Sequence, residues 1–262
     1  MIKRTLAALV FVSLSTTALA ANDTTATSLF TDAEKQEIGK VAMEYLVNNP
    51  EVLIAASNEL KAREQARMNQ MQVEQAVKLE AALLENETTP FEGSKDAKVA
   101  IIKFLDYQCS YCIKASPVVE SVLEANSDAK LLVKNFPVLA KRSPLSNTAA
   151  QASLEVFKQQ GEEGFTAFHH SMMESAQQGN PLTEEVLLNL ASEAGVDVKI
   201  ENLSAWSDEL AKSVNLAQQL GFSGTPAYVV MPTSGASIDN VTVLGGYVEA
   251  DKLQQAVELA QQ

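Results

Sequence analysis

The sequence is short of cysteine, histidine and positive charge, and it has no long apolar run. Two cysteines in 262 residues cannot make a disulfide-stapled scaffold. An excess of 33 acidic over 20 basic residues gives a net charge of −13, which argues against binding nucleic acid through its phosphates. No run of roughly 18 apolar residues occurs, so we expect no permanent membrane span. With 46% hydrophobic residues, the chain is too apolar to be intrinsically disordered and predicts one full-sized domain with an appendage.

The N-terminus has the order of a secretory signal peptide. A basic head at residues 3–4 precedes an apolar segment, and the small residues of Ala18-Leu19-Ala20 end it. We therefore expect residues 1–20 to be a signal peptide cleaved near Ala20, and the mature protein to reach an oxidising compartment. The alternative is a buried N-terminal helix, which would not need the small-residue ending.

Residues 21–89 are interpreted as a helical arm. After a polar, Thr-rich tail, we expect a helix from Thr31, with Glu34 as its capping-box partner. A second, long helix is expected from Glu51 to about Asn86, a stretch without glycine or proline that follows Pro50. Because this stretch is rich in Gln, Glu and Lys, it has too little apolar face to pack on a globular core alone. We predict that residues 29–88 form a homo-oligomer; a solitary solvated linker helix is the alternative.

The second domain is expected to span residues 90–262 and to have an α/β order of elements. Short apolar runs bounded by turn residues indicate buried strands, and longer periodic segments indicate helices. Several of these helical segments, at about 143–220, form an insertion between strands. The expected strands are at 99–105, 131–136, 227–231 and 241–244, and the helices that flank them are at 109–126 and 249–261.

The two cysteines lie in the sequence Cys109-Ser110-Tyr111-Cys112, directly after an expected strand and at the start of an expected helix. The free N–H groups and the positive dipole end of a helix favour an anion at Cys109. We therefore expect its thiol to ionise well below the ordinary pKa of about 8.5. Cys112 lies one turn further along, close enough to close a disulfide with Cys109 and to resolve a mixed one. The spacing predicts thiol–disulfide redox chemistry, in which the thiolate is the nucleophile.

The cysteine pair has three alternative uses. A structural disulfide across four residues would constrain little of the unfolded chain. Half of a zinc site would need further ligands, and the adjacent His169 and His170 are interpreted as ordinary helix residues, with a ligand role as the alternative. A Cu(I) site formed by the two thiolates is the third.

A second signal is Gly224-Thr225-Pro226, just before an expected strand. Combined with a strand-CxxC-helix unit, Pro226 can be a cis residue packed beside the disulfide. Four motifs of the second domain belong together: Phe104-Leu105-Asp106-Tyr107-Gln108-Cys109-Ser110-Tyr111-Cys112, Phe136-Pro137-Val138-Leu139, Gly224-Thr225-Pro226 and Leu244-Gly245-Gly246-Tyr247. With these motifs the second domain resembles the DsbA-type thiol–disulfide oxidoreductases of the bacterial periplasm.

The resemblance covers about residues 91–262 and implies a thioredoxin fold with an inserted helical domain. The N-terminal arm is similar to that of the suppressor-of-copper-sensitivity thioredoxin-like proteins, which oligomerise through such an extension. The resemblance further implies that Cys109 attacks and that Cys112 is the buried resolving cysteine. It also implies that Pro226 is the cis-proline and that Thr225 presents its backbone to a substrate strand.

The sequence departs from the family pattern in two places. Strongly oxidising members carry Pro-His between the cysteines, whereas Ser110 and Tyr111 stand here and are expected to tune the redox potential. Lys103 stands where many relatives have a buried glutamate. A lysine there would favour the Cys109 thiolate, whereas Asp106 would oppose it.

We therefore predict an oligomeric, periplasmic enzyme that forms or isomerises disulfides in exported proteins through its CxxC pair. No cofactor or metal is expected beyond the two sulfurs, and no nucleic-acid partner. The resemblance implies a membrane redox partner, either a reoxidase or a reductase. The alternatives are a copper-binding or copper-tolerance protein that uses the same thiols, and a non-catalytic chaperone or interaction protein.

Overall fold

The computed structural model describes residues 29–85 and 87–262. The signal peptide predicted for residues 1–20 lies outside the described residues. The chain divides into two compact units, Met1–Glu59 and Leu60–Gln262, and the division falls inside helix α2. Within the described part of the chain, no helix is both long and apolar enough to cross a membrane.

The described part of the N-terminal unit consists of α1 (Asp32–Asn48) and the start of α2 (Glu51–Lys78). Thr31 caps α1 and forms the expected capping box with Glu34. No side chain of α1 is buried, although several large apolar ones project from it. The half-exposed apolar residues of this helix include Ile38, Val41 and Tyr45. Their spacing places them on one face, where a partner helix could cover them.

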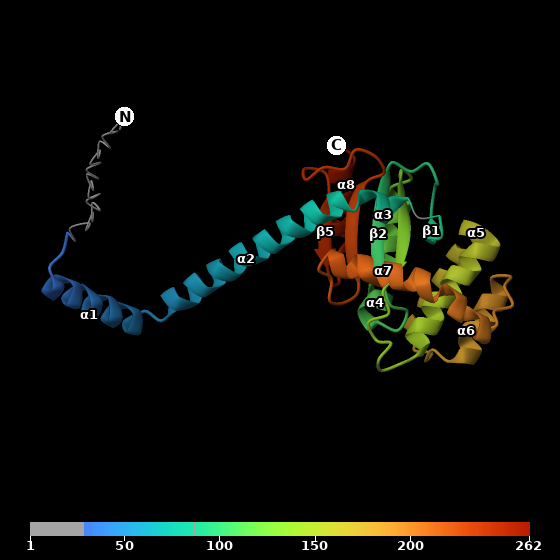
Figure 1. Ribbon diagram of the computed structural model, residues 1–262, viewed down its shortest axis with the longest axis horizontal. Helices are drawn as coiled ribbons and strands as arrows, with labels where there is room; N and C mark the ends of the chain where they lie inside the picture. Colours follow the sequence, from blue (N-terminus) through green and yellow to red (C-terminus); the bar gives the residue numbers. More distant parts are fainter. Residues whose placement is uncertain (1–28, 86) are drawn as a thin grey trace, which may run out of the picture. The chain divides into compact units, whose positions relative to one another are not determined.

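The second unit contains a five-stranded sheet in the order β1-β3-β2-β4-β5 (Figure 1). The central strands β2 and β3 run parallel, and β4 runs antiparallel to β2. β1 and β5 complete the two edges in antiparallel pairings. The strands are β1 (Phe91–Glu92), β2 (Val99–Leu105), β3 (Ala129–Asn135), β4 (Ala227–Pro232) and β5 (Thr242–Gly245). The four strands predicted from the sequence are confirmed, and only the two-residue β1 was missed.

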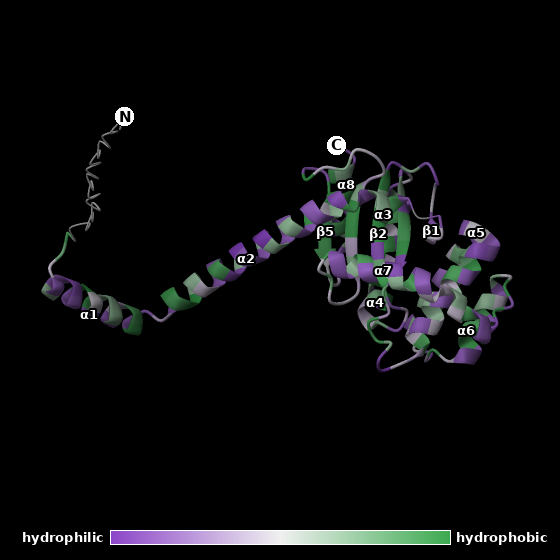
Figure 2. Ribbon diagram, in the orientation of Figure 1, coloured by the Kyte–Doolittle hydropathy of each residue, from purple (hydrophilic) through white to green (hydrophobic). Residues whose placement is uncertain are grey.

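Helices cover both faces of this sheet, and Figure 2 shows the strands between them in the colours of hydrophobic residues. Helices α4 (Ser110–Ala125), α5 (Leu145–Gln177) and α8 (Ala250–Ala260) surround one buried cluster. α7 (Ser207–Gln219) and the end of α2 pack on a second cluster at the opposite face. The fold is therefore the expected α/β fold with a mixed sheet as its middle layer.

The inserted helical block lies between β3 and β4. It contains α5, which changes direction at Gly161 (φ 66°), together with α6 (Glu184–Glu193) and the 3₁₀-helix Ile200–Trp206. The buried residues of α5 and α6 join the same cluster as α4 and α8. The insertion therefore thickens the layer that carries the cysteine pair.

The long helix predicted after Pro50 differs from the structure at its C-terminal end. α2 ends at Lys78, and a separate short helix α3 (Glu80–Leu84) follows. Ala76 and Leu83 are fully buried in the second cluster. The Gln72 Nε2 also donates a hydrogen bond of 3.0 Å to the Leu220 carbonyl. The C-terminal end of the predicted helical arm is therefore part of the packed domain.

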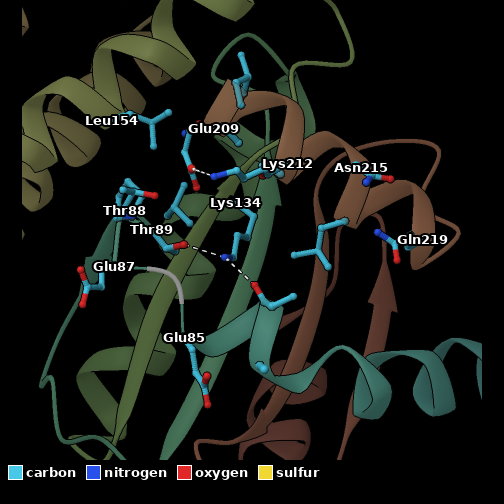
Figure 3. Close-up of a pocket in the computed structure, with 18 residues that line it drawn as sticks. Glu85, Glu87, Thr88, Thr89, Lys134, Leu154, Glu209, Lys212, Asn215 and Gln219 are labelled. Atoms are coloured by element: carbon cyan, nitrogen blue, oxygen red, sulfur yellow. Dashed lines mark hydrogen bonds and ion pairs between the residues drawn. The ribbon is translucent and has the colours of Figure 1, made fainter. Parts of the chain in front are cut away.

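Lys134 fastens the segment after α3 to the sheet. Its buried Nζ donates hydrogen bonds to Thr89 Oγ1 at 2.7 Å and to the Ala82 carbonyl at 3.3 Å, as Figure 3 shows. Burial lowers the pKa of Lys134 to about 8. These groups line a pocket of about 570 Å³ on the side of the sheet that carries α7.

Candidate active site

The turn between β2 and α4 is fixed by Asp106, which is almost fully buried. One carboxylate oxygen accepts the backbone N–H of Gln108 at 2.9 Å, and the other accepts that of Leu139 at 2.9 Å. The Asp106 carbonyl also accepts the N–H of Cys109 at 3.0 Å. Asp106 therefore positions Cys109 at the end of the strand by tying three backbone N–H groups together.

Cys109 is the N-cap residue of α4, and Cys112 lies in its first turn. Both are free thiols, with Cys109 partly exposed and Cys112 0% exposed. A substrate sulfur can therefore reach Cys109, whereas Cys112 can react only with a sulfur already attached there.

The two thiols have opposite acidities. Hydrogen bonding from the Cys112 thiol, with smaller contributions from Thr225 and the N–H groups of Cys112 and Tyr111, lowers the pKa of Cys109 to about 5 against the effect of burial. Burial is the main cause that raises the pKa of Cys112 far above that of a free thiol. Cys109 is consequently a thiolate at neutral pH and Cys112 a thiol.

The segment before β4 lies against the cysteine pair. The Thr225–Pro226 peptide bond is cis, as expected from the sequence. Cys109 Sγ lies 3.2 Å from the Thr225 carbonyl oxygen, to which the thiol form donates. The Pro226 carbonyl accepts the N–H of Gly246 at 2.8 Å, so this segment is held from the β5 side. The structure thus brings together Cys109, Cys112, Thr225 and Pro226.

The two residues between the cysteines face outward. Ser110 is exposed, and the Tyr111 side chain is 60% exposed. Beyond them, the Lys114 ammonium lies 4.1 Å from the centre of the Tyr247 ring. Lys114 and Tyr247 were not singled out among the expected site residues, and no local spacing connects them.

Lys103 lies behind the pair, fully buried in β2. Its register partner in β4 is Tyr228, which is also 0% exposed. Burial lowers the pKa of Lys103, and a negative charge on Cys112 is the largest opposing influence, ahead of the one from Cys109. Tyr228 was missed from the sequence, although it lies two residues after Pro226 in a predicted strand.

The two histidines lie on α5, where each is hydrogen-bonded to a polar side chain. Tyr107 and His169 share a buried hydrogen bond of 3.1 Å between the hydroxyl and Nδ1, and burial keeps the pKa of His169 well below its ordinary value. His170 Nε2 lies 3.0 Å from the Glu92 carboxylate, which raises the pKa of His170. Among the described residues, no group of three or more His, Cys, Asp or Glu side chains could hold a metal ion.

A CxxC pair at a helix start, with a cis-proline beside it, on a mixed sheet covered on both faces, defines a thioredoxin-fold dithiol protein. The family model for the DSBA-like thioredoxin domain matches residues 100–258. This protein therefore belongs to the DsbA-like family of thiol–disulfide oxidoreductases. Residues 34–67 match the N-terminal domain of the copper resistance protein ScsC.

Solved structures and curated relatives agree with this assignment. Salmonella enterica Typhimurium BcfH is 33% identical, with a TM-score of 0.73 over 88% of this chain and 97% of that one. A linker-deletion mutant of Proteus mirabilis ScsC is 27% identical, with a TM-score of 0.62 over 90% of this chain and 98% of that one. A probable disulfide bond formation protein D of Bacillus anthracis is 25% identical over 150 residues, which cover 53% of this chain and 67% of that protein.

Proposed function

We propose that this protein forms or isomerises disulfide bonds in exported proteins by exchange at Cys109 and Cys112. The observation that carries the proposal is the asymmetry of the pair, because Cys109 is accessible and has a pKa of about 5, whereas Cys112 is buried with a raised pKa. The low pKa makes Cys109 both the thiolate that attacks and the better leaving group.

In the proposed reaction, the Cys109 thiolate attacks a substrate disulfide, or a substrate thiolate attacks the Cys109–Cys112 disulfide. Either step produces a mixed disulfide on Cys109. An extended substrate segment would lie along Thr225 and Pro226, because the Thr225 carbonyl is already within 3.2 Å of the reacting sulfur. Cys112 then resolves the mixed disulfide, or the substrate's second thiol releases Cys109.

The choice between net oxidation and isomerisation rests on the arm. The match of residues 34–67 to the ScsC N-terminal domain and the exposed apolar face of α1 support assembly of several copies through residues 29–88. We propose that assembly holds two or more Cys109 sites around one misfolded substrate, which favours isomerisation. A membrane redox partner would then set how much Cys109 is kept reduced.

Export to the periplasm is part of the proposal, with the order of residues 1–20 as its support. Copper binding by the two thiols is the less favoured reading. The ScsC match covers residues 34–67, which contain neither cysteine, whereas both cysteines lie inside the oxidoreductase match. The proposed limits remain 21–89 for the arm and 90–262 for the catalytic part, with the last turns of α2 and α3 packed on the catalytic part.

Trapping of mixed disulfides tests the proposed roles. Cys112→Ser should accumulate covalent complexes with a misfolded secretory protein that carries disulfides, because the Cys109 thiolate can still attack a substrate disulfide, whose other sulfur leaves as a thiolate, while resolution by Cys112 is lost. The matched variant Cys109→Ser should trap none. Non-reducing gels after acid quench measure both. Equal trapping by the two variants would contradict the assignment, as would wild-type protein that leaves scrambled ribonuclease and reduced insulin unchanged.

A further inference from the structure

The amine of Lys103 is buried without a hydrogen-bond partner. Lys103 is 0% exposed, and within the described part of the chain no group accepts a hydrogen bond from its Nζ. The hydroxyl of Tyr228, opposite it in β4, is buried and unpartnered in the same way. Nearly all buried polar groups in folded proteins are paired, so two unpaired ones side by side indicate a function.

These two groups belong to the layer that contains Cys112. Alternation along β2 places Lys103 on the same face as Ile101 and Leu105, and both of those residues share a buried cluster with Cys112 and Tyr228. Lys134, the buried lysine of β3, provides the contrast. It lies on the opposite face with Leu132, and its Nζ is satisfied by Thr89 and Ala82.

The charge environment of Lys103 is mixed. A thiolate on Cys112 and the carboxylates of Glu120 and Glu92 raise its pKa, against the larger opposing effect of burial. An ammonium at Lys103 in turn lowers the pKa of Cys112. Titratable groups of four neighbouring elements face Lys103. They are Cys109 at the N-cap of α4, Cys112 and Glu120 on α4, Glu92 on β1, His169 and His170 on α5, and Tyr228 on β4.

We infer that Lys103 is the proton acceptor for Cys112 when that thiol resolves the mixed disulfide on Cys109. As the Cys112 sulfur bonds to the Cys109 sulfur, the bond between Cys109 and the substrate sulfur breaks. The substrate leaves as a thiolate, and the proton of Cys112 passes to the lone pair of the neutral Lys103 amine. In this step the Cys112 sulfur is oxidised and the substrate sulfur is reduced, while the Cys109 sulfur stays at the oxidation level of a disulfide. The reverse reaction returns the proton from the ammonium to the departing Cys112.

A buried lysine suits this task for two reasons. Burial lowers the pKa of the amine and so favours its neutral form, which has a lone pair that can take a proton. Once protonated, the ammonium favours a thiolate at Cys112 over a thiol, which is the state that reacts. Cys112 needs such an acceptor because it is 0% exposed and cannot pass its proton directly to water. The inference rests on the proposed function, since it assigns the second step of that exchange.

Two-phase kinetics with dithiodipyridine test the inference on the full-length reduced protein. Cys109 attacks the probe and releases one pyridinethione, and Cys112 then releases the second in a step that does not depend on probe concentration. In Lys103→Met, we expect the second phase to slow about a hundred-fold, the size typical of general base catalysis. It should also rise in proportion to hydroxide, whereas the wild-type rate should level off as the amine becomes neutral. Lys103→Glu, which restores a proton acceptor, should recover the rate to within about ten-fold, with its pH profile shifted downward.

Lys134→Met is the matched control, because it removes a buried lysine from the other face of the sheet. Its second phase should keep the wild-type rate and pH profile. An unchanged second phase in Lys103→Met, or an equal slowing in Lys134→Met, would overturn the role of Lys103. If Lys103→Met does not fold, Lys103→Gln carries the same expectation. A failure of the proposed function itself is distinguishable, because the first phase would then be slow in the wild-type protein too.

Discussion

The low pKa of Cys109 has a consequence for stability that can be measured directly. The unfolded chain carries a Cys109 thiol with a pKa of about 8.5, whereas the folded protein lowers it to about 5. Between these values the unfolded state binds more protons than the folded one, so the stability of the reduced protein rises with pH. This contribution is lost as the pH falls through about 5 and is complete above about 8.5.

The size of the effect follows from the shift. Each pH unit inside the window contributes at most about 1.4 kcal/mol to the free energy of unfolding. Because Cys109 is partly exposed, solvent screens its interactions, and we expect roughly half of that limit. Between pH values of about 5.5 and 7.5, the reduced protein should therefore gain about 1–2 kcal/mol from this one group. Cys112 stays protonated in both states across this window, because burial raises its pKa.

Urea unfolding of the reduced wild-type protein and of Cys109→Ser, at equal protein concentration and with a phosphine reductant present, measures the effect. The other titratable groups are common to both proteins, so the difference between the two free energies isolates Cys109. That difference should change by about 1–2 kcal/mol across the window in favour of the wild type. Parallel curves would refute the argument, as would a thiolate absorbance midpoint near 8 in the reduced wild-type protein.

Further predictions concern Asp106, which holds the site in place, and the N-terminal helices. Asp106→Ala should lower the free energy of unfolding by about 2–4 kcal/mol, measured by urea denaturation, because the buried N–H groups of Gln108 and Leu139 lose their acceptor. A chain beginning at Leu60 should be folded, and light scattering should show that it is a monomer. It should still oxidise dithiols but have lost most isomerase activity. One beginning at Phe91 should unfold at least about 3 kcal/mol more easily, since it lacks Ala76 and Leu83. A Leu60 chain that isomerises as well as the full-length protein would show that the arm has another use.

Local sequence signals were enough for the elements that carry the cysteines. The apolar run of β2, the helix start at Cys109 and the strand after Pro226 each have a signature within a few residues. The packing of α2 was not predictable in this way. Only its last turns pack on the domain, through Ala76 and its neighbours, whereas the rest of the helix is largely exposed and has more polar than apolar residues. Averaged over its length, the helix therefore resembles a solvated one.

Contacts between distant segments account for what the sequence left open. Lys103 was recognised as unusual, but its position opposite Tyr228 depends on the register between β2 and β4, which are separated by the whole helical insertion. The hydrogen bond from the Leu139 N–H to the Asp106 carboxylate likewise depends on the path of the chain after β3. Neither relation has a local periodicity, because pairing of strands is decided by the buried face of the sheet and by packing over it.

The two halves of the proposed exchange consequently depend on different parts of the chain. Attack at Cys109 is controlled mainly within one turn of helix, by the Cys112 thiol and by the N–H groups of Cys112 and Tyr111, with Thr225 contributing from the segment before β4. Resolution by Cys112 is controlled from the sheet behind it, by the charge and proton affinity of Lys103. Substitutions at Ser110 or Tyr111 should therefore alter the first step more than the second, because both side chains face solvent, away from the buried Lys103. A protein that forms disulfides needs a fast first step, and one that isomerises them needs a second step slow enough for the substrate's own thiols to act first. A substitution at Lys103 should therefore alter resolution by Cys112 more than it alters the acidity that makes Cys109 reactive, since Cys109 has the smallest of the charge interactions that raise the pKa of Lys103.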